Sequence, residues 1–134
     1  MVNPSDAPRW RGLWHLALRV SDIARSRAFY QDVLGMKVVW EPDADNIYLS
    51  SGQDNLALHQ ATPDVCISHA DSPLDHFGFF VHRKEDVDLL AKKMEEIGVI
   101  LAKPVRLHRD GSYSFYIDDP DHNRIQILYS PQIS

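Results

Sequence analysis

Residues 15–20 read His-Leu-Ala-Leu-Arg-Val, and residues 76–81 read His-Phe-Gly-Phe-Phe-Val, 61 positions further along the chain. Both stretches have the same order of side chains: histidine, large apolar, tiny, large apolar, any residue, valine. Each is followed by a charged segment with an apolar stripe and then by a glycine, Gly35 or Gly98. A pattern that recurs with this regularity indicates an internal repeat. The chain is therefore expected to contain two equivalent modules.

Each module is expected to run in the order strand, helix, strand, strand, strand. Helices are predicted at about 21–34 and 84–97, because apolar residues recur there at spacings of three and four. Turn residues such as Pro, Asp and Gly separate the strands that follow. The predicted strands are 15–20, 36–41, 46–50 and 55–60 in the first module, and 76–81, 100–107, 113–118 and 123–129 in the second.

The composition is typical of one globular domain, with 134 residues of which 44% are hydrophobic and 25% charged. We treat 1–134 as a single α+β domain, with modules at 12–60 and 74–130 and a linker at 61–73. A net charge of −5 argues against nucleic-acid binding. The apolar runs are too short to span a membrane. The single cysteine excludes an intrachain disulfide and favours the cytoplasm.

Polar side chains fall on the strand faces that point away from the predicted helices. His15 and His76 open the first strand of each module, and Gln126 lies in the last strand. If the two sheets curl toward each other, two imidazoles and one amide oxygen converge on a cavity. These donors suit a divalent ion such as Fe, Mn, Ni or Zn, with positions left open for a substrate. The alternative for each residue is an ordinary hydrogen-bonded strand position.

Three more side chains share these faces and are candidates for binding a small molecule. Arg19 and Arg124 are predicted to hold an anionic group such as a carboxylate or phosphonate, with a solvated or salt-bridged role as the alternative. Phe80 is an aromatic side chain on the same face as His76. We therefore include Phe80 among the substrate-binding candidates.

Four stretches of the chain carry a family resemblance. They are His-Leu-Ala-Leu-Arg-Val-Ser-Asp-Ile at 15–23, Ala-Phe-Tyr-Gln-Asp-Val-Leu-Gly at 28–35, His-Phe-Gly-Phe at 76–79 and Ser-Phe-Tyr-Ile-Asp-Asp-Pro-Asp-His-Asn-Arg-Ile-Gln at 114–126. Together they resemble the vicinal oxygen chelate superfamily, which includes glyoxalase I, fosfomycin- and bleomycin-resistance proteins, methylmalonyl-CoA epimerase and extradiol dioxygenases. The resemblance implies paired βαβββ modules whose curved mixed sheets enclose a cleft, but it selects no reaction.

The resemblance implies metal ligands on the first and last strand of each module, at His15, Ala57, His76 and Gln126. The last of these is normally Glu, and Ala57 stands where glyoxalase I has a Glu. We therefore do not expect the glyoxalase I reaction, which needs a metal-bound carboxylate to move a proton. Gln126 can still ligate a metal through its amide oxygen.

Because this carboxylate is missing, proton transfer is expected from other groups near the implied cleft. His59 would share the face of Ala57, and Glu41 ends the second strand of its module. The cleft wall in this family often contacts substrate, so Tyr116 is predicted to be catalytic and Tyr113 to bind substrate. Ordinary aromatic packing is the alternative for both tyrosines.

Two functions therefore stay open. The first is a small-molecule metalloenzyme, dioxygenase-like or lyase-like, in which a divalent metal acts as a Lewis acid on adjacent substrate oxygens. The alternative is a metal-free protein that binds and sequesters a small molecule, as in bleomycin resistance. A homodimer is expected in either case, because two-fold dimers are the commonest oligomers. Members of the family close the cleft within one chain or across a two-fold axis.

Overall fold

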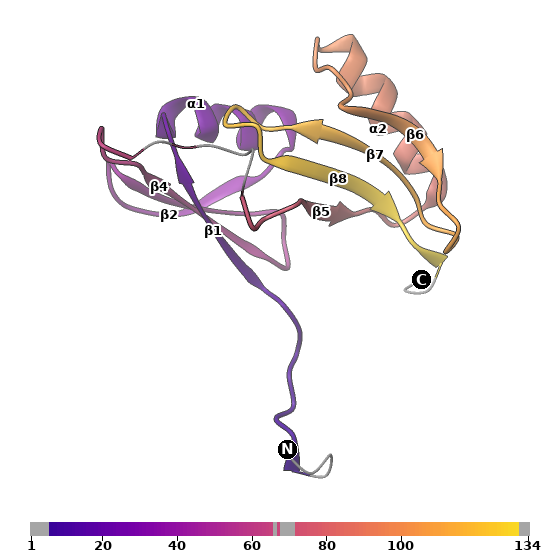
Figure 1. Ribbon diagram of the computed structural model, residues 1–134, viewed down its shortest axis with the longest axis horizontal. Helices are drawn as coiled ribbons and strands as arrows, with labels where there is room; N and C mark the ends of the chain where they lie inside the picture. The colour runs from indigo at the N-terminus through magenta and orange to yellow at the C-terminus, as the bar shows by residue number, and fades with distance from the viewer. Residues whose placement is uncertain (1–5, 66, 68–71, 132–134) are drawn as a thin grey trace.

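The computed structural model describes residues 6–65, 67 and 72–131, and each half of the chain forms one four-stranded sheet (Figure 1). The strand orders are β1-β4-β3-β2 and β5-β8-β7-β6. In each sheet the first and last strand of the module run parallel, and the other neighbours run antiparallel. The strands are β1 (His15–Val20), β2 (Lys37–Asp43), β3 (Asn46–Ser50), β4 (Asn55–Gln60), β5 (Phe77–Phe80), β6 (Lys103–Leu107), β7 (Tyr113–Asp118) and β8 (Arg124–Tyr129). The predicted α+β class with two βαβββ modules is confirmed. Residues 66 and 68–71 of the predicted linker lie outside the described residues.

The first helical segment differs from the single helix predicted over 21–34. An α-helix, α1 (Ile23–Ala28), passes directly into a π-helical turn, η2 (Phe29–Val33). The wider turn contains Tyr30, which is fully buried and donates a hydrogen bond from its hydroxyl to Asp119 of the other module. A contact outside the helix therefore constrains the backbone here, and helical periodicity alone does not encode it. The segment ends at Gly35, whose φ of 69° suits a helix C-terminus.

The second helix, α2 (Lys84–Glu96), follows its sequence pattern closely. Val87, Ala91 and Met94 recur at spacings of four and three, and all three are buried. The side chain of Asp86 accepts a hydrogen bond from the backbone N–H of Arg83 at 3.2 Å and so caps the first turn. The helix packs on β6, β7 and β8, whereas α1 packs on β4. Within the described ranges, none of the helices is long and apolar enough to cross a bilayer.

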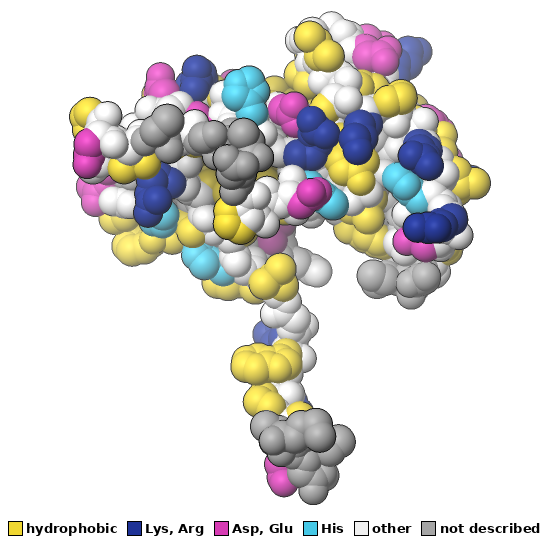
Figure 2. All heavy atoms as spheres, in the orientation of Figure 1, with side chains coloured by type: hydrophobic (Ala, Val, Ile, Leu, Met, Phe, Trp, Pro, Cys, Tyr) yellow, Lys and Arg dark blue, Asp and Glu magenta, His cyan; other side chains and the backbone are white. Residues whose placement is uncertain are grey.

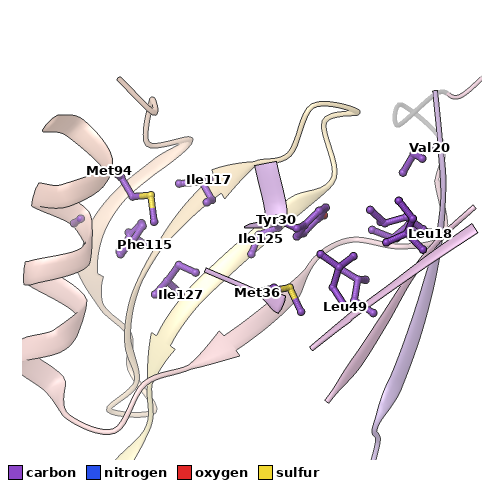
Figure 3. Close-up of a cluster of buried hydrophobic side chains, with 14 of the residues drawn as sticks. Leu18, Val20, Tyr30, Met36, Leu49, Met94, Phe115, Ile117, Ile125 and Ile127 are labelled. Atoms are coloured by element: carbon purple, nitrogen blue, oxygen red, sulfur yellow. The ribbon is translucent and has the colours of Figure 1, made fainter. Parts of the chain in front are cut away.

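One continuous cluster of buried side chains joins the two modules. Figure 3 shows Tyr30 and Met36 of the first module lying between Leu49 on one side and Ile125 and Ile127 of β8 on the other. All five side chains are at most 3% exposed. Because the two modules share this core, each contributes to the stability of the other.

The β7–β8 turn is tied to the start of α1 by polar contacts. The hydroxyl of Tyr30 donates to Oδ2 of Asp119 at 2.6 Å, and the backbone N–H of Ser21 donates to Oδ2 of Asp121 at 3.0 Å. Arg25 forms an ion pair with Asp121 at 3.6 Å. Burial raises the pKa of the Tyr30 hydroxyl above its ordinary value, and the negative charge of Asp119 raises it further. The two aspartates of this turn therefore hold the modules together.

The residues that lead into β1 form an extended arm that leaves the body of the molecule (Figure 1). It carries three large apolar side chains, Trp10, Leu13 and Trp14, which are 83%, 99% and 60% exposed. Apolar groups that project in this way are typical of a surface that another protein surface covers.

Candidate functional site

Two of the predicted metal ligands, His15 and Gln126, lie on the sheet faces that the helices leave uncovered. In β1 the alternation of side chains leaves His15 and Arg19 exposed, while Leu18 and Val20 are buried beneath α1. In β8 the neighbours of Gln126 are buried on the side of α2, and Gln126 itself is half-buried on the opposite face. We call these uncovered sides the outer faces of the two sheets.

A cavity of about 600 Å³ opens on the outer face of the C-terminal sheet. Gln126 of β8 and Tyr116 of β7 stand directly opposite each other in this cavity. His76 precedes β5, and its ring meets the Tyr116 ring edge-on with 5.5 Å between centroids. We call this cavity the β6–β8 cavity. The residues that line it are His76, Arg106, His108, Arg109, Asp110, Ser112, Tyr116 and Gln126.

His76 is oriented by the residue before it. Its Nδ1 lies 2.6 Å from Oδ1 of Asp75. Because a carboxylate only accepts hydrogen bonds, the neutral imidazole carries its proton on Nδ1 and its lone pair on Nε2. This hydrogen bond holds the pKa of Asp75 below its ordinary value. A carboxylate on the far nitrogen of a histidine is the usual arrangement for metal-binding imidazoles.

Gln126 is oriented by Ser114 on the neighbouring strand β7. Its Nε2 donates to the Ser114 Oγ at 3.0 Å, and the same Oγ lies 2.8 Å from Nε2 of His108. Ser114 is fully buried. The amide oxygen of Gln126 has no hydrogen-bond partner among the residues that the structure describes, and it is therefore the atom available to a ligand.

Close packing around Gln126 requires a glycine on the neighbouring strand. Gly78 of β5 stands opposite Gln126 in the parallel ladder. A Cβ at Gly78 would lie 3.1 Å from the backbone oxygen of Gln126 and 3.0 Å from the side chain of Leu128. This contact explains why the repeat has a tiny residue at this position, with Ala17 as its counterpart in β1.

His15 has the same kind of support but lies in another cavity. Its Nδ1 is 2.6 Å from Oδ1 of Asn55 on β4, which leaves Nε2 free of hydrogen bonds within the described ranges. His15 and His76 both line a cavity of about 380 Å³ between the modules, whereas Gln126 lines only the β6–β8 cavity. No group of three or more His, Cys, Asp and Glu side chains is placed to hold one ion in the part of the chain that is described. A site with three ligands therefore needs an amide oxygen or a ligand from another copy.

The predicted proton-transfer residues are separated by the fold. Tyr116 lies in the β6–β8 cavity, as described above. His59 lies on the N-terminal sheet, where its Nδ1 is 2.6 Å from Oδ1 of Asn46. Glu41 of β2 accepts a hydrogen bond from Arg27 of α1 at 3.0 Å, so its carboxylate already has a cationic partner. Of these three residues, Tyr116 lines the β6–β8 cavity and the other two do not, and all three roles stay predictions.

Two predicted substrate-binding residues face α2 or lie at its edge. The Tyr113 hydroxyl donates to Asp88 of α2 at 2.7 Å, and this carboxylate raises the pKa of Tyr113. Tyr113 therefore points away from the β6–β8 cavity, because it sits three residues before Tyr116 on the same strand. Phe80 stacks on Tyr129, with 6.5 Å between ring centroids, and is 46% exposed. Neither side chain lines the cavity, so the predicted contact with substrate gains no support.

The two arginines predicted to bind an anion differ in their partners. Arg124 donates from Nε to Oδ1 of Asp118 at 2.7 Å, and this carboxylate raises the pKa of Arg124. Its charge is therefore largely balanced. Arg19 is exposed on β1 and has no ion pair among the described residues. It belongs to the N-terminal sheet and does not line the β6–β8 cavity.

Several residues of the site were missed by sequence reasoning. Ser114 could have been found, because it lies two positions before Tyr116 and so shares its face of β7. Asp75 could have been found as the neighbour of His76. Asn55 could not have been found from the sequence, because its contact with His15 depends on the register between β1 and β4.

Comparison with known proteins identifies the family of this chain. The sequence profile of the Glyoxalase/Bleomycin resistance protein/Dioxygenase superfamily matches residues 12–127. The chain is 29% identical to glutathione transferase FosA from Serratia marcescens over 119 residues, which is 87% of this chain and 79% of that protein. It is 27% identical to 2,2',3-trihydroxybiphenyl dioxygenase from Sphingomonas paucimobilis over 127 residues, covering 91% of this chain and 42% of the dioxygenase.

Solved structures show the same fold. The crystal structure of lactoylglutathione lyase from Agrobacterium tumefaciens superimposes with a TM-score of 0.77, at 22% identity, over 95% of this chain and 99% of that one. At that identity the likeness concerns the fold alone. Taken with the profile match, which extends from the arm before β1 into β8, it shows that the chain belongs to the Glyoxalase/Bleomycin resistance protein/Dioxygenase superfamily.

Proposed function

We propose that this chain is a metal-dependent enzyme for a small-molecule substrate, with His15, His76 and Gln126 as ligands of a divalent ion. One observation carries the proposal. In each of the three side chains one polar atom is held by a neighbouring residue, and the other has no hydrogen bond within the described ranges. Side chains that a hydrogen bond already holds in one orientation lose little conformational freedom when they bind a metal. Two imidazole nitrogens and one oxygen suit Fe, Mn, Ni or Zn.

A divalent ion bound there would act as a Lewis acid on adjacent oxygens of the substrate. Tyr116 stands opposite Gln126 and beside His76, so its hydroxyl is the group placed to give or take a proton. Because Gln126 is neutral, it balances less of the charge of the ion than a glutamate would. An anionic substrate would supply the missing negative charge.

The relatives suggest the class of reaction. One is named as a glutathione transferase and another as a dioxygenase. We therefore place group transfer and dioxygenation ahead of a lyase reaction. The glyoxalase I reaction is not proposed, because Ala57 is a fully buried alanine between Ala17 and Tyr48 and offers no carboxylate.

We further propose that the working form is a homodimer in the cytoplasm. His15 and Gln126 line different cavities within one chain. A second copy could bring its own His15 to the β6–β8 cavity, and the exposed Trp14 next to His15 gives such a contact an apolar surface. The single cysteine suits a reducing compartment.

The test is the metal content of untagged protein, followed by calorimetric titration with Fe(II), Mn(II), Ni(II) and Zn(II). We expect about one ion per chain from the one proposed site per chain. His76→Ala should abolish binding, whereas His82→Ala, an exposed histidine outside the cavity, should leave it unchanged. Absence of binding to the wild type at tens of micromolar metal would overturn the metal mechanism.

A second candidate function rests on aromatic side chains of the N-terminal sheet. Trp40 is 58% exposed, and its ring lies 4.8 Å from that of Tyr48. An exposed tryptophan packed against a second aromatic ring suits a protein that sequesters an aromatic or cationic small molecule without a metal. Ligand binding that quenches tryptophan fluorescence equally with and without chelator would support this function, and a strict dependence on metal would exclude it.

A further inference from the structure

The β6–β8 cavity carries positive charge that the described part of the chain leaves unbalanced. Arg106 and Arg109 both line it, and neither has an ion pair or hydrogen bond among the described residues. Lys103 lies at the cavity edge, with its Nζ 5.3 Å from the centre of the Tyr116 ring. Figure 2 shows Lys and Arg side chains gathered over the surface of the C-terminal half. This concentration contrasts with the net charge of −5 for the whole chain.

An irregularity in β6 brings these charges to one face. In the ladder Lys103 pairs with Tyr116, and Arg106 pairs with Ser114, with a register shift between the two pairs. Three steps along β6 therefore match two steps along β7. In a regular strand, residues three apart point to opposite faces, but the shift places Lys103 and Arg106 on the same face as Tyr116. The backbone thus directs two cations to the outer face, opposite Tyr116 and Ser114 of β7.

The cavity lining holds two guanidinium groups and one carboxylate. Asp110 is the one carboxylate among the lining residues, and it accepts hydrogen bonds from the backbone N–H and hydroxyl of Ser112 at 2.9 and 2.6 Å. These bonds hold the pKa of Asp110 below its ordinary value. Asp118 is paired with Arg124. Arg106 and Arg109 therefore keep their guanidinium donors for a ligand.

We propose that Arg106, Arg109 and Lys103 bind the oxyanion group, a carboxylate or a phosphate, of a small-molecule ligand in the β6–β8 cavity. A guanidinium presents paired donors that match the two oxygens of such a group. The cavity of about 600 Å³ has the size of a small-molecule site. An extended polyanion is disfavoured, because the rest of the chain is acidic. That this oxyanion group belongs to the substrate rests on the proposed function. Binding of an oxyanion in the cavity, however, requires no metal.

The test is calorimetric titration of the full chain in chelator, with inorganic phosphate and with acetate as probes. Arg106→Gln and Arg109→Gln should each weaken binding of the preferred probe by about tenfold or more, since each removes hydrogen bonds to a charged group. Lys92→Gln is the control, because Lys92 is also exposed and has no ion pair among the described residues but lies on α2, which covers the opposite face of the sheet. It should leave the affinity unchanged. Circular dichroism and the melting temperature of each variant establish that it is folded.

The outcomes separate this proposal from the metal proposal. Failure of both probes to bind at tens of millimolar would overturn the anion site, even if the protein binds a metal. Equal losses in Lys92→Gln and Arg106→Gln would also overturn it, since they would indicate diffuse surface charge. The anion site would also be overturned if a single-stranded oligonucleotide bound tightly at physiological salt and this binding depended on Arg106. Anion binding that depends on Arg106 in a protein without metal affinity would support the anion site and contradict the metalloenzyme.

Discussion

The Oγ of Ser114 lies 3.0 Å from Nε2 of Gln126, and it is the only hydrogen-bond partner of that amide among the described residues. Nε2 can only donate, so Ser114 accepts this bond, and the same Oγ lies 2.8 Å from Nε2 of His108. The bond to Ser114 fixes the orientation of the Gln126 amide group. It leaves the amide oxygen of Gln126, which is the atom that can ligate a metal, without a competing bond.

Ser114→Ala is expected to lower metal affinity by about tenfold, because the Gln126 amide then loses the bond that sets its orientation. Gln126→Glu should raise the affinity, and Ser114→Ala should matter less in that background, since either carboxylate oxygen can ligate. Calorimetric titration with Ni(II) across the four proteins measures this coupling. Equal losses in both backgrounds would show that Ser114 does not act through the amide.

Asp75→Ala is expected to weaken metal binding by about 10- to 100-fold, the usual effect of removing the partner of a ligating histidine. Without the carboxylate, the proton on His76 is no longer fixed at Nδ1, and the ring is free to rotate. The control is Asp64→Ala, which removes an exposed carboxylate bonded to Thr62 far from the cavity lining. The two variants are compared by Ni(II) titration, and equal affinities would rule out an orienting role for Asp75.

The sequence was sufficient to predict the sheets, because strand boundaries depend on local alternation and turn residues. The strands at 46–50, 55–60 and 113–118 lie where the pattern predicts them. The alternation of side chains along a strand also distinguishes the two tyrosines of β7. Tyr113 and Tyr116 are three residues apart, so they must point to opposite faces of a regular strand, and only Tyr116 lines the cavity.

Other parts of the site depend on contacts between distant segments. The shift that brings Arg106 to the same face as Tyr116 belongs to the pairing of β6 with β7, and no local pattern in β6 indicates it. The π-helical turn at Tyr30 likewise accompanies a contact with Asp119, 89 residues away. Periodicity predicts which side of an element is buried, but it does not predict such tertiary adjustments.

Mixing His15→Ala with His76→Ala tests whether two copies share a site. Each variant alone should bind no metal. If His15 comes from a second copy, subunit exchange creates mixed dimers with one intact site each, and about a quarter of the metal binding should return. If His15 and His76 of one chain form the site, mixing restores nothing. Metal content after exchange, with the molecular mass from sedimentation, distinguishes the two arrangements.

The buried pair of Tyr30 and Asp119 predicts how stability depends on alkaline pH. Burial and the charge of Asp119 raise the pKa of Tyr30 above its ordinary value of 10.0 in the folded chain. Below pH 10 the hydroxyl is protonated in both folded and unfolded states, so the stabilising contact is fully present. As the pH rises above 10, the unfolded state loses this proton and the folded state retains it. The free energy of unfolding should then fall by about 1.4 kcal/mol per pH unit.

Tyr30→Phe should be less stable than wild type at pH 8, because Asp119 loses a buried donor. Its stability should also fall less steeply above pH 10, since the group that titrates only on unfolding is gone. Tyr48→Phe removes a tyrosine that makes no bond to Asp119 and should keep the wild-type slope. Urea unfolding between pH 8 and 11 measures all three proteins. A wild-type slope retained in Tyr30→Phe would show that another group controls the alkaline transition, and that Tyr30 ionises no less readily in the folded chain.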